Sequence, residues 1–223
     1  EAQDLLGLDI TTGVAINTGR ITGGAYTVGA DGTGRFRALT TPRSEFFIRF
    51  AAKVSAHVNS DGNFWWRDSS NNILGGFRRV SVSGVLQILV GASVVATSVK
   101  ALGLDQWYLI EIRIKLDDSA GVIQLKIDGV TDTTFNGDTK PSAETTIAYI
   151  SFGHGPQAGT WWIDDVAVND TLGTSDNSWC GDGHLYALPP NGDGDASDFL
   201  GSDGNSTNNY LLVDEIPSNS DTD

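Results

Sequence analysis

The chain has 223 residues, of which 39% are hydrophobic, and its formal net charge is −14 at pH 7. A chain of this length and apolar content can fill one two-layered core. The negative charge repels phosphate backbones and excludes nucleic acid as a partner unless a basic patch exists. No apolar run reaches the roughly 18 residues of a membrane span, so no membrane insertion is expected.

The first part of the chain combines loop residues with short apolar segments. Residues 1–34 are rich in glycine, threonine and aspartate and predict one or two short strands joined by long loops. In residues 45–53, apolar side chains at every second position, starting with Phe46, alternate with a set that includes Arg49 and Lys53. This period of two predicts a strand whose aromatic face points into the core.

Short strand-like segments then follow one another up to residue 99. We expect strands at 64–67, 73–79, 80–83, 85–90 and 93–99. Serine and asparagine at 69–72, together with Gly84 and Gly91, supply turn chemistry between them. Such regular spacing is typical of a sandwich or jelly roll.

The clearest strand pair lies at residues 107–130. Isoleucine or leucine at every second position of this segment alternates with Glu111, Arg113 and Lys115, the pattern of a strand with one face in water. Turn-forming residues at 117–121 follow, and the alternation then resumes. The pattern predicts an antiparallel hairpin.

Two further strands are expected at 145–153 and 160–168, after which the composition changes. Residues 171–223 contain ten Asp or Glu and no Lys or Arg, whereas residues 1–170 contain 18 acids and 14 bases. We therefore expect a sandwich over residues 1–170 and an extended acidic C-terminal arm over 171–223, packed partly on the sandwich or on a neighbouring subunit. The single cysteine, Cys180, excludes an intrachain disulfide.

Several motifs carry a resemblance to known families. LDDSAG at 116–121, LKIDG at 125–129 and GTWWIDDVAVND at 159–170 resemble the laminin G-like, concanavalin A-like jelly roll. Followed by LYALPPNGDGDASDF at 185–199 and NNYLLVDEIP at 208–217, this arrangement resembles a family of structural proteins of tailed bacteriophages. The resemblance implies an all-β, antiparallel two-sheet jelly-roll sandwich, although this fold hosts many functions.

Glycoside hydrolases and polysaccharide lyases share this fold, but their motifs are missing from the sequence. Retaining glucanases carry Glu-x-Asp-x-x-Glu, whereas Glu111 is followed by the basic Arg113 and Lys115. The segment 43–45 (Arg-Ser-Glu) is superficially similar to an element of alginate lyases, but the companion Gln-Ile-His strand is absent. We therefore expect no catalytic residues and no enzymatic activity.

Four neighbouring residues, Asn63, Trp65, Trp66 and Arg67, are candidates for carbohydrate binding. Aromatic rings stack on the apolar C–H face of a pyranose. Because adjacent strand residues face opposite sides, at most one tryptophan of such a pair is exposed on a given face. Core packing for one ring and exposure for the other is the default expectation, and sugar stacking is the sharper alternative.

Two places have the oxygen-rich chemistry that a hard cation such as Ca²⁺ prefers. Asp193, Asp195 and Asp198 resemble a calcium loop, although the glycine and the bidentate glutamate of the EF-hand pattern are missing. Asp164 and Asp165 near the end of a strand form the second candidate site. The alternative at both places is ordinary turn chemistry or an ion pair. A structural Ca²⁺ is the one cofactor that the sequence suggests.

The leading hypothesis is a non-enzymatic virion structural protein of a tailed phage, displayed on the particle surface as a tail-associated or capsid-decorating component. The resemblance then implies other virion proteins as partners, a homo-oligomer, and adhesion to a host-surface glycan. The second hypothesis is a lectin-like, carbohydrate-binding module that recognises host glycans. Cleavage of a polysaccharide is the third hypothesis.

Overall fold

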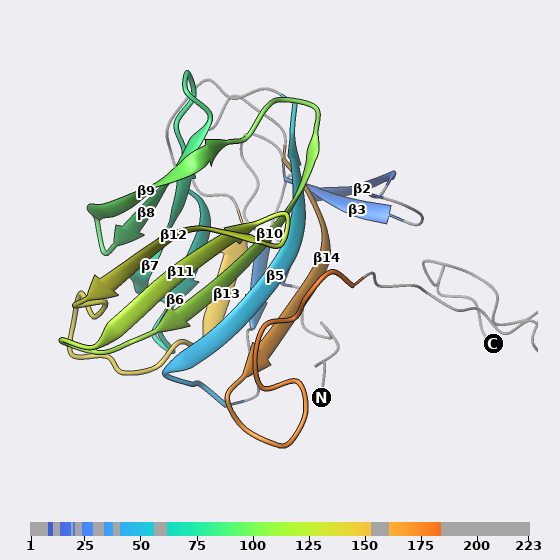
Figure 1. Cartoon of the computed structure of the whole chain (residues 1–223). Helices are drawn as coiled ribbons and strands as arrows, with labels where there is room; N and C mark the ends of the chain where they lie inside the picture. The colour runs from blue at the N-terminus through green and yellow to red at the C-terminus, as the bar shows by residue number, and fades with distance from the viewer. Residues whose placement is uncertain are drawn as a thin grey trace, which may run out of the picture. The chain divides into compact units, whose positions relative to one another are not determined.

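Two seven-stranded antiparallel sheets pack face to face in the computed structural model, which describes residues 9–10, 14–18, 20, 24–28, 34–37, 41–55, 62–152 and 161–183 (Figure 1). The described residues contain no helix. The predicted all-β, two-sheet sandwich is thus confirmed. None of the described segments forms a helix able to cross a membrane.

Sheet A contains most of the predicted meander. The strands predicted near 64–67, 73–79, 85–90 and 93–99 are present, but the strand predicted at 80–83 is a turn. There the Val80 carbonyl accepts a hydrogen bond from the Gly84 N–H, and Gly84 has a φ of 74° that a larger residue rarely adopts. In spatial order, sheet A consists of β1 (Asp9–Ile10), β4 (Gly34–Arg37), β13 (Tyr149–Phe152), β6 (Gly62–Arg67), β7 (Ile73–Arg79), β8 (Val85–Val90) and β9 (Ser93–Ala101).

Sheet B contains the predicted hairpin, with Ile112 opposite Leu125. Its edge strand was not predicted, because residues 131–136 lack apolar alternation; Asp128 and Gly129, both at positive φ, form the tight turn that leads into it. In spatial order, sheet B consists of β12 (Val130–Gly137), β11 (Gly121–Ile127), β10 (Trp107–Lys115), β5 (Glu45–Val54), β14 (Trp161–Asp170), β3 (Gly24–Val28) and β2 (Val14–Thr18).

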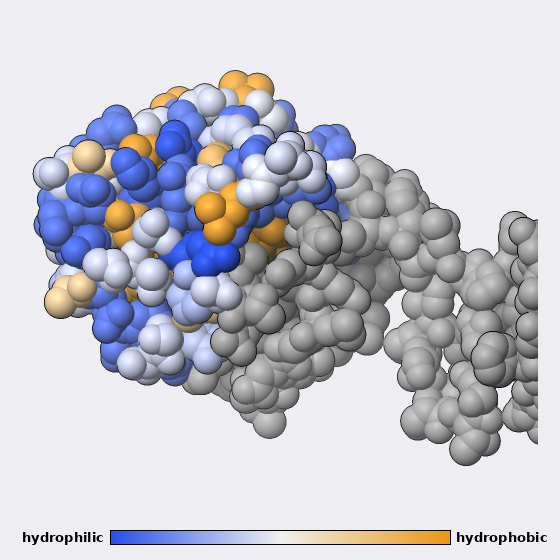
Figure 2. All heavy atoms as spheres, turned by 90° about the horizontal axis from the view of Figure 1, so that it is seen from below, coloured by the Kyte–Doolittle hydropathy of each residue, from blue (hydrophilic) through white to orange (hydrophobic). Residues whose placement is uncertain are grey.

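Aromatic and aliphatic side chains from both sheets meet between the layers. Phe50 of β5 stacks on Phe64 of β6 and contacts Phe152 of β13, with ring centroids 5.2 and 5.0 Å apart. Burial of each such side chain stabilises the fold by roughly 1.5–3 kcal/mol, so this packing holds the sheets together. On the face shown in Figure 2, hydrophobic residues form only small separate groups among hydrophilic ones.

The segment after β14 folds back onto sheet B, and we call residues 171–183 the strap. The Trp179 ring packs edge-on against Phe47 of β5 at 5.4 Å, and the Cys180 thiol lies 3.7 Å from the Phe47 carbonyl oxygen. The strap belongs to the same compact unit as the sandwich, which ends at His184. The second unit, Leu185–Asp223, is outside the described residues, so the predicted acidic arm stays a prediction there.

Candidate binding face

A row of three side chains crosses the outer face of sheet B. In the strand ladder Trp107 of β10 lies opposite Lys53 of β5, which in turn lies opposite Trp162 of β14. The Lys53 ammonium sits over both rings, 5.2 Å from the Trp107 centroid and 4.4 Å from the Trp162 centroid. All three side chains are half-buried. The row therefore combines two partly exposed aromatic rings with one positive charge.

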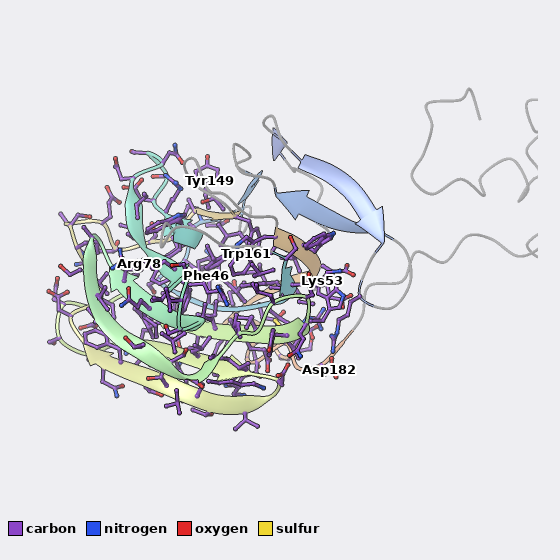
Figure 3. All side chains as sticks on the ribbon, turned by 90° about the horizontal axis from the view of Figure 1, so that it is seen from above. Phe46, Lys53, Arg78, Tyr149, Trp161 and Asp182 are labelled. Carbon is purple, nitrogen blue, oxygen red and sulfur yellow. The ribbon has the colours of Figure 1, made fainter. Side chains whose placement is uncertain are left out.

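A groove of about 340 Å³ opens beside this row, between sheet B and the strap. Leu109, two residues beyond Trp107 on the same face of β10, lines it together with Lys126, Trp179 and Asp182. Figure 3 shows Lys53 and Asp182 on the same side of the molecule, with Arg78 on the opposite side. The interior pocket of the sandwich, by contrast, encloses only about 10 Å³, so the groove has far more room for a ligand than the core.

Two buried charged residues anchor the strap over the centre of this face. Arg49 and Glu111 lie opposite each other in the β5–β10 ladder and are only 4% and 3% exposed. The Arg49 guanidinium donates hydrogen bonds to the backbone carbonyls of Asp165 and Gly181, at 3.0 and 3.2 Å. The Gly181 N–H donates to the Glu111 carboxylate at 2.9 Å. Both side chains are therefore engaged in holding backbone and not presented to a substrate.

Arg20 brings together the two aspartates that were predicted as a cation site. Its backbone N–H donates to the Asp164 carboxylate at 2.7 Å, and its guanidinium lies 3.7 Å from the Asp165 carboxylate and 3.3 Å from that of Asp182. A β-bulge between Asp164 and Ala167 interrupts the alternation of the strand at these two aspartates. Arg20 supplies the positive charge that these carboxylates face.

Two ionisable groups next to residues that line the groove have shifted pKa values. Near Asp128, the hydrogen bond from Lys100 to the Asp128 carboxylate, at 2.6 Å, raises the pKa of Lys100. Under the strap, burial raises the pKa of the Cys180 thiol to about 11, although the Arg49 charge opposes this shift. The thiol is therefore neutral at physiological pH and is a poor nucleophile.

The predicted tryptophan platform is not exposed. Trp65 and Trp66 are 8% and 0% exposed, which contradicts the expectation that one of the two rings faces solvent. Each packs against a glycine of β7, on opposite faces of sheet A. Arg67 is also buried, where it donates hydrogen bonds to the Ser151 hydroxyl and the Asn71 carbonyl. The side chain of Asn63 lies outside the described part of the chain.

The predicted calcium loop also lies outside the described residues. Asp193, Asp195 and Asp198 all follow residue 183. In the part of the chain that the structure describes, no group of three or more His, Cys, Asp or Glu side chains could hold a metal ion.

Sequence reasoning missed Trp107, Lys53 and Trp179 as site residues. The sequence pattern could have indicated Trp107 and Lys53, because each occupies one of the alternate strand positions that otherwise hold polar side chains. In the adjacent pair Trp161 and Trp162, the first ring lies in the core and the second is half-buried on the outer face. Trp179 carries no periodic signal, since it belongs to the strap.

Comparisons with known proteins identify the fold. No family model and no curated protein matches the chain. Among solved structures, it is similar to the cellulose-induced protein Cip1 (15% identity, TM-score 0.55, covering 80% of this chain and 96% of that one). It is also similar to an endo-β-1,4-glucuronan lyase from the fungus Trichoderma reesei (11%, 0.52, 75% and 92%).

A third match is domain 4 of AbnA, an extracellular arabinanase from Geobacillus stearothermophilus, solved in complex with arabinotriose (16%, 0.51, 70% and 74%). In a match to a sialidase, the corresponding region makes up only 18% of that longer chain. At these identities the likeness shows the fold alone, a jelly-roll sandwich shared by carbohydrate-binding modules and by polysaccharide-cleaving enzymes.

Proposed function

We propose that this chain is a non-catalytic carbohydrate-binding domain whose ligand lies on the outer face of sheet B. The observation that carries the proposal is the row of Trp107, Lys53 and Trp162 beside the groove. Half-buried indole rings offer the apolar surface on which sugar rings stack, and the groove adds charged groups that hydrogen-bond to hydroxyls. The arabinotriose complex of the AbnA domain supports the proposal, because that domain has the same fold.

The non-catalytic part of the proposal rests on the strap. Arg49 and Glu111 occupy the centre of the outer face, where a substrate of the sheet would lie, and both hold the strap backbone. A general acid or base must reach the proton it transfers. Neither group meets this condition while the strap is in place. Because the similar glucuronan lyase is named as an enzyme, the binding test must include an assay for polysaccharide cleavage.

The proposal is tested by titrating the protein with oligosaccharides in a calorimeter. Trp107→Ala and Trp162→Ala should each weaken binding about tenfold, since stacking on a ring contributes on the order of 1 kcal/mol or more. Tyr149→Ala is the matched control, because Tyr149 is a half-buried aromatic residue of sheet A on the opposite layer. Absence of binding to a broad glycan panel contradicts the proposal, and release of unsaturated sugars or new reducing ends contradicts its non-catalytic part.

We further propose, from the sequence resemblance alone, that the domain is displayed on a phage particle as a homo-oligomer. The solved structures that match the chain bear on carbohydrate binding and not on this placement. Mass spectrometry and antibody labelling of purified particles test it. Absence of the protein from the particles refutes it and leaves the carbohydrate-binding proposal intact.

A further inference from the structure

We propose that the oligosaccharide bound on the outer face of sheet B is acidic, and that its carboxylate groups pair with Lys53 and Lys126. This inference rests on the proposed function and adds the chemical class of the ligand. It is carried by the distribution of lysines over the molecule and by the aromatic rings beside two of them.

The sequence contains five lysines among 28 acidic residues. Lys100 and Lys140 pair with aspartates at 2.6 and 3.2 Å. The other three, Lys53, Lys115 and Lys126, form no ion pair among the described residues. The alternation of side chains along the paired strands puts all three lysines on the outer face of sheet B. In a chain with twice as many acids as bases, the lysines that form no ion pair are thus gathered on the proposed binding face, where Glu111, Asp128 and Asp182 of the groove are held by Gly181, Lys100 and Arg20.

Two of these lysines sit against tryptophan rings. Lys53 lies over Trp107 and Trp162, and the Lys126 ammonium lies 3.8 Å from the centroid of the Trp179 ring. A cation–π contact fixes the position of an ammonium group and leaves N–H donors directed away from the ring. An incoming carboxylate can therefore bind a positioned charge.

The combination of ring and charge suits a uronic acid residue. Its apolar C–H face can lie on an indole while its carboxylate accepts hydrogen bonds from the neighbouring ammonium group. Lys53 lies opposite Trp107 and Lys126 lies opposite Glu111 in the ladders, so four residues of β10, about 13 Å, separate the two places along the strands. An oligosaccharide, and not a single sugar, is needed to reach both.

The inference is tested by comparing oligogalacturonate, a neutral arabino-oligosaccharide of equal length and a sulfated oligosaccharide in the same calorimetric titration. The oligogalacturonate should bind at least tenfold more tightly than the neutral ligand, and the preference should shrink as NaCl is raised. Lys53→Gln and Lys126→Gln should each weaken oligogalacturonate binding by roughly tenfold and weaken neutral-sugar binding by a clearly smaller factor, so that the preference for the acidic ligand falls. Lys53→Arg should retain most of the affinity, and Lys140→Gln is the matched control.

The possible failures are distinguishable. Equal binding of neutral and acidic ligands, unaffected by Lys53→Gln, overturns the acidic ligand and leaves carbohydrate binding standing. Preference for the sulfated ligand overturns the assignment to carboxylates. Binding of no oligosaccharide overturns both this inference and the proposed function. A thermal melt of each variant establishes that a loss of affinity does not arise from unfolding.

Discussion

At the scale of single residues, a pair of glycines accommodates a pair of tryptophans. In the β6–β7 ladder Trp65 lies opposite Gly76 and Trp66 opposite Gly75. A β-carbon at either glycine would overlap the facing indole ring and a backbone carbonyl oxygen. The missing side chains thus let one ring lie flat in the core and the other on the outer side of sheet A. This arrangement explains why neither tryptophan is exposed.

Replacing either glycine should destabilise the fold. We expect Gly75→Ala and Gly76→Ala to lower the free energy of unfolding by about 2 kcal/mol or more, because the added methyl group has no space. Urea denaturation measures the change. Gly103→Ala is the control: a β-carbon there meets only side-chain atoms, the nearest being the Tyr108 hydroxyl at 3.2 Å. Losses as small as that of Gly103→Ala would show that the rings can shift.

The buried thiol under the strap gives a pH-dependent prediction. The pKa of Cys180 rises from 9.0 to about 11 on folding, chiefly through burial. The unfolded chain therefore releases this proton at lower pH than the folded protein, so the free energy of unfolding falls as pH rises from about 9 to about 11. Denaturation of wild type and of Cys180→Ala across this range should show a steeper fall in the wild type, and the difference between the two proteins measures the contribution of the thiol.

A reactivity measurement checks the same thiol independently. At pH 8 the folded protein should react with a thiol reagent far more slowly than the chain in denaturant, since the thiolate is the reactive form. Equal rates would show that the strap does not cover Cys180.

At the scale of elements, Arg49 is the residue that ties the strap to sheet B. Arg49→Lys should lower the free energy of unfolding by about 1–3 kcal/mol, because a lysine cannot reproduce the two divergent hydrogen bonds of the guanidinium. It should also speed the reaction of Cys180, whose thiol lies beside Phe47 under the same strap. Denaturation and thiol kinetics measure the two effects.

Arg113→Lys is the matched control for this change. Arg113 extends from the same face of sheet B but forms a half-exposed ion pair with Glu45 at 2.7 Å. Such pairs contribute about 0–1 kcal/mol. If both substitutions have the same small effect, the strap is held by Trp179 packing and not by Arg49.

At the scale of the whole molecule, one edge of the sandwich is closed by a carboxylate. Asp132 of β12, at the edge of sheet B, accepts hydrogen bonds from the Val99 and Lys100 N–H groups of β9, at the edge of sheet A. Unpaired N–H groups on an edge strand can pair with another molecule. The contact therefore joins the two layers and covers donors that would otherwise be available for association.

Removal of this carboxylate should open the edge. We expect Asp132→Ala to lower the free energy of unfolding by about 1–2 kcal/mol and to increase self-association, measured by light scattering across a concentration series. Asp118→Ala serves as the control, since it removes an equal charge from a surface ion pair with Lys140. If Asp118→Ala increases self-association as much as Asp132→Ala does, the effect arises from net charge and not from the uncovered N–H groups.

The strands were predictable because their signal is local. In β5 and β10 every second residue is apolar, and the two-residue repeat depends only on neighbours along the chain. The missed elements lack that signal. β12 is mostly polar and is held by pairing with β11, while Asp164 and Asp165 sit at a bulge that breaks the repeat.

The candidate site was less predictable, because the contacts that form it are not local in the sequence. The sequence assigned Arg49 and Glu111 correctly to the polar face of their strands, yet both are buried there because the strap covers them. Trp65 and Trp66 were chosen for their aromatic character, but the glycines that receive them come from another strand.

The sequence by itself determined the all-β sandwich and the side of each central strand that faces the core. The reason is that apolar residues at every second position of a strand lie on one face, and hydrophobic burial turns that face inward. Only the tertiary structure decided which side chains share a surface. Trp107, Lys53 and Trp162 come from three strands far apart in sequence, and strand register alone places them in one row. Register is set by the packing of the whole sandwich, so no local sequence pattern predicts which residues become neighbours on a binding face.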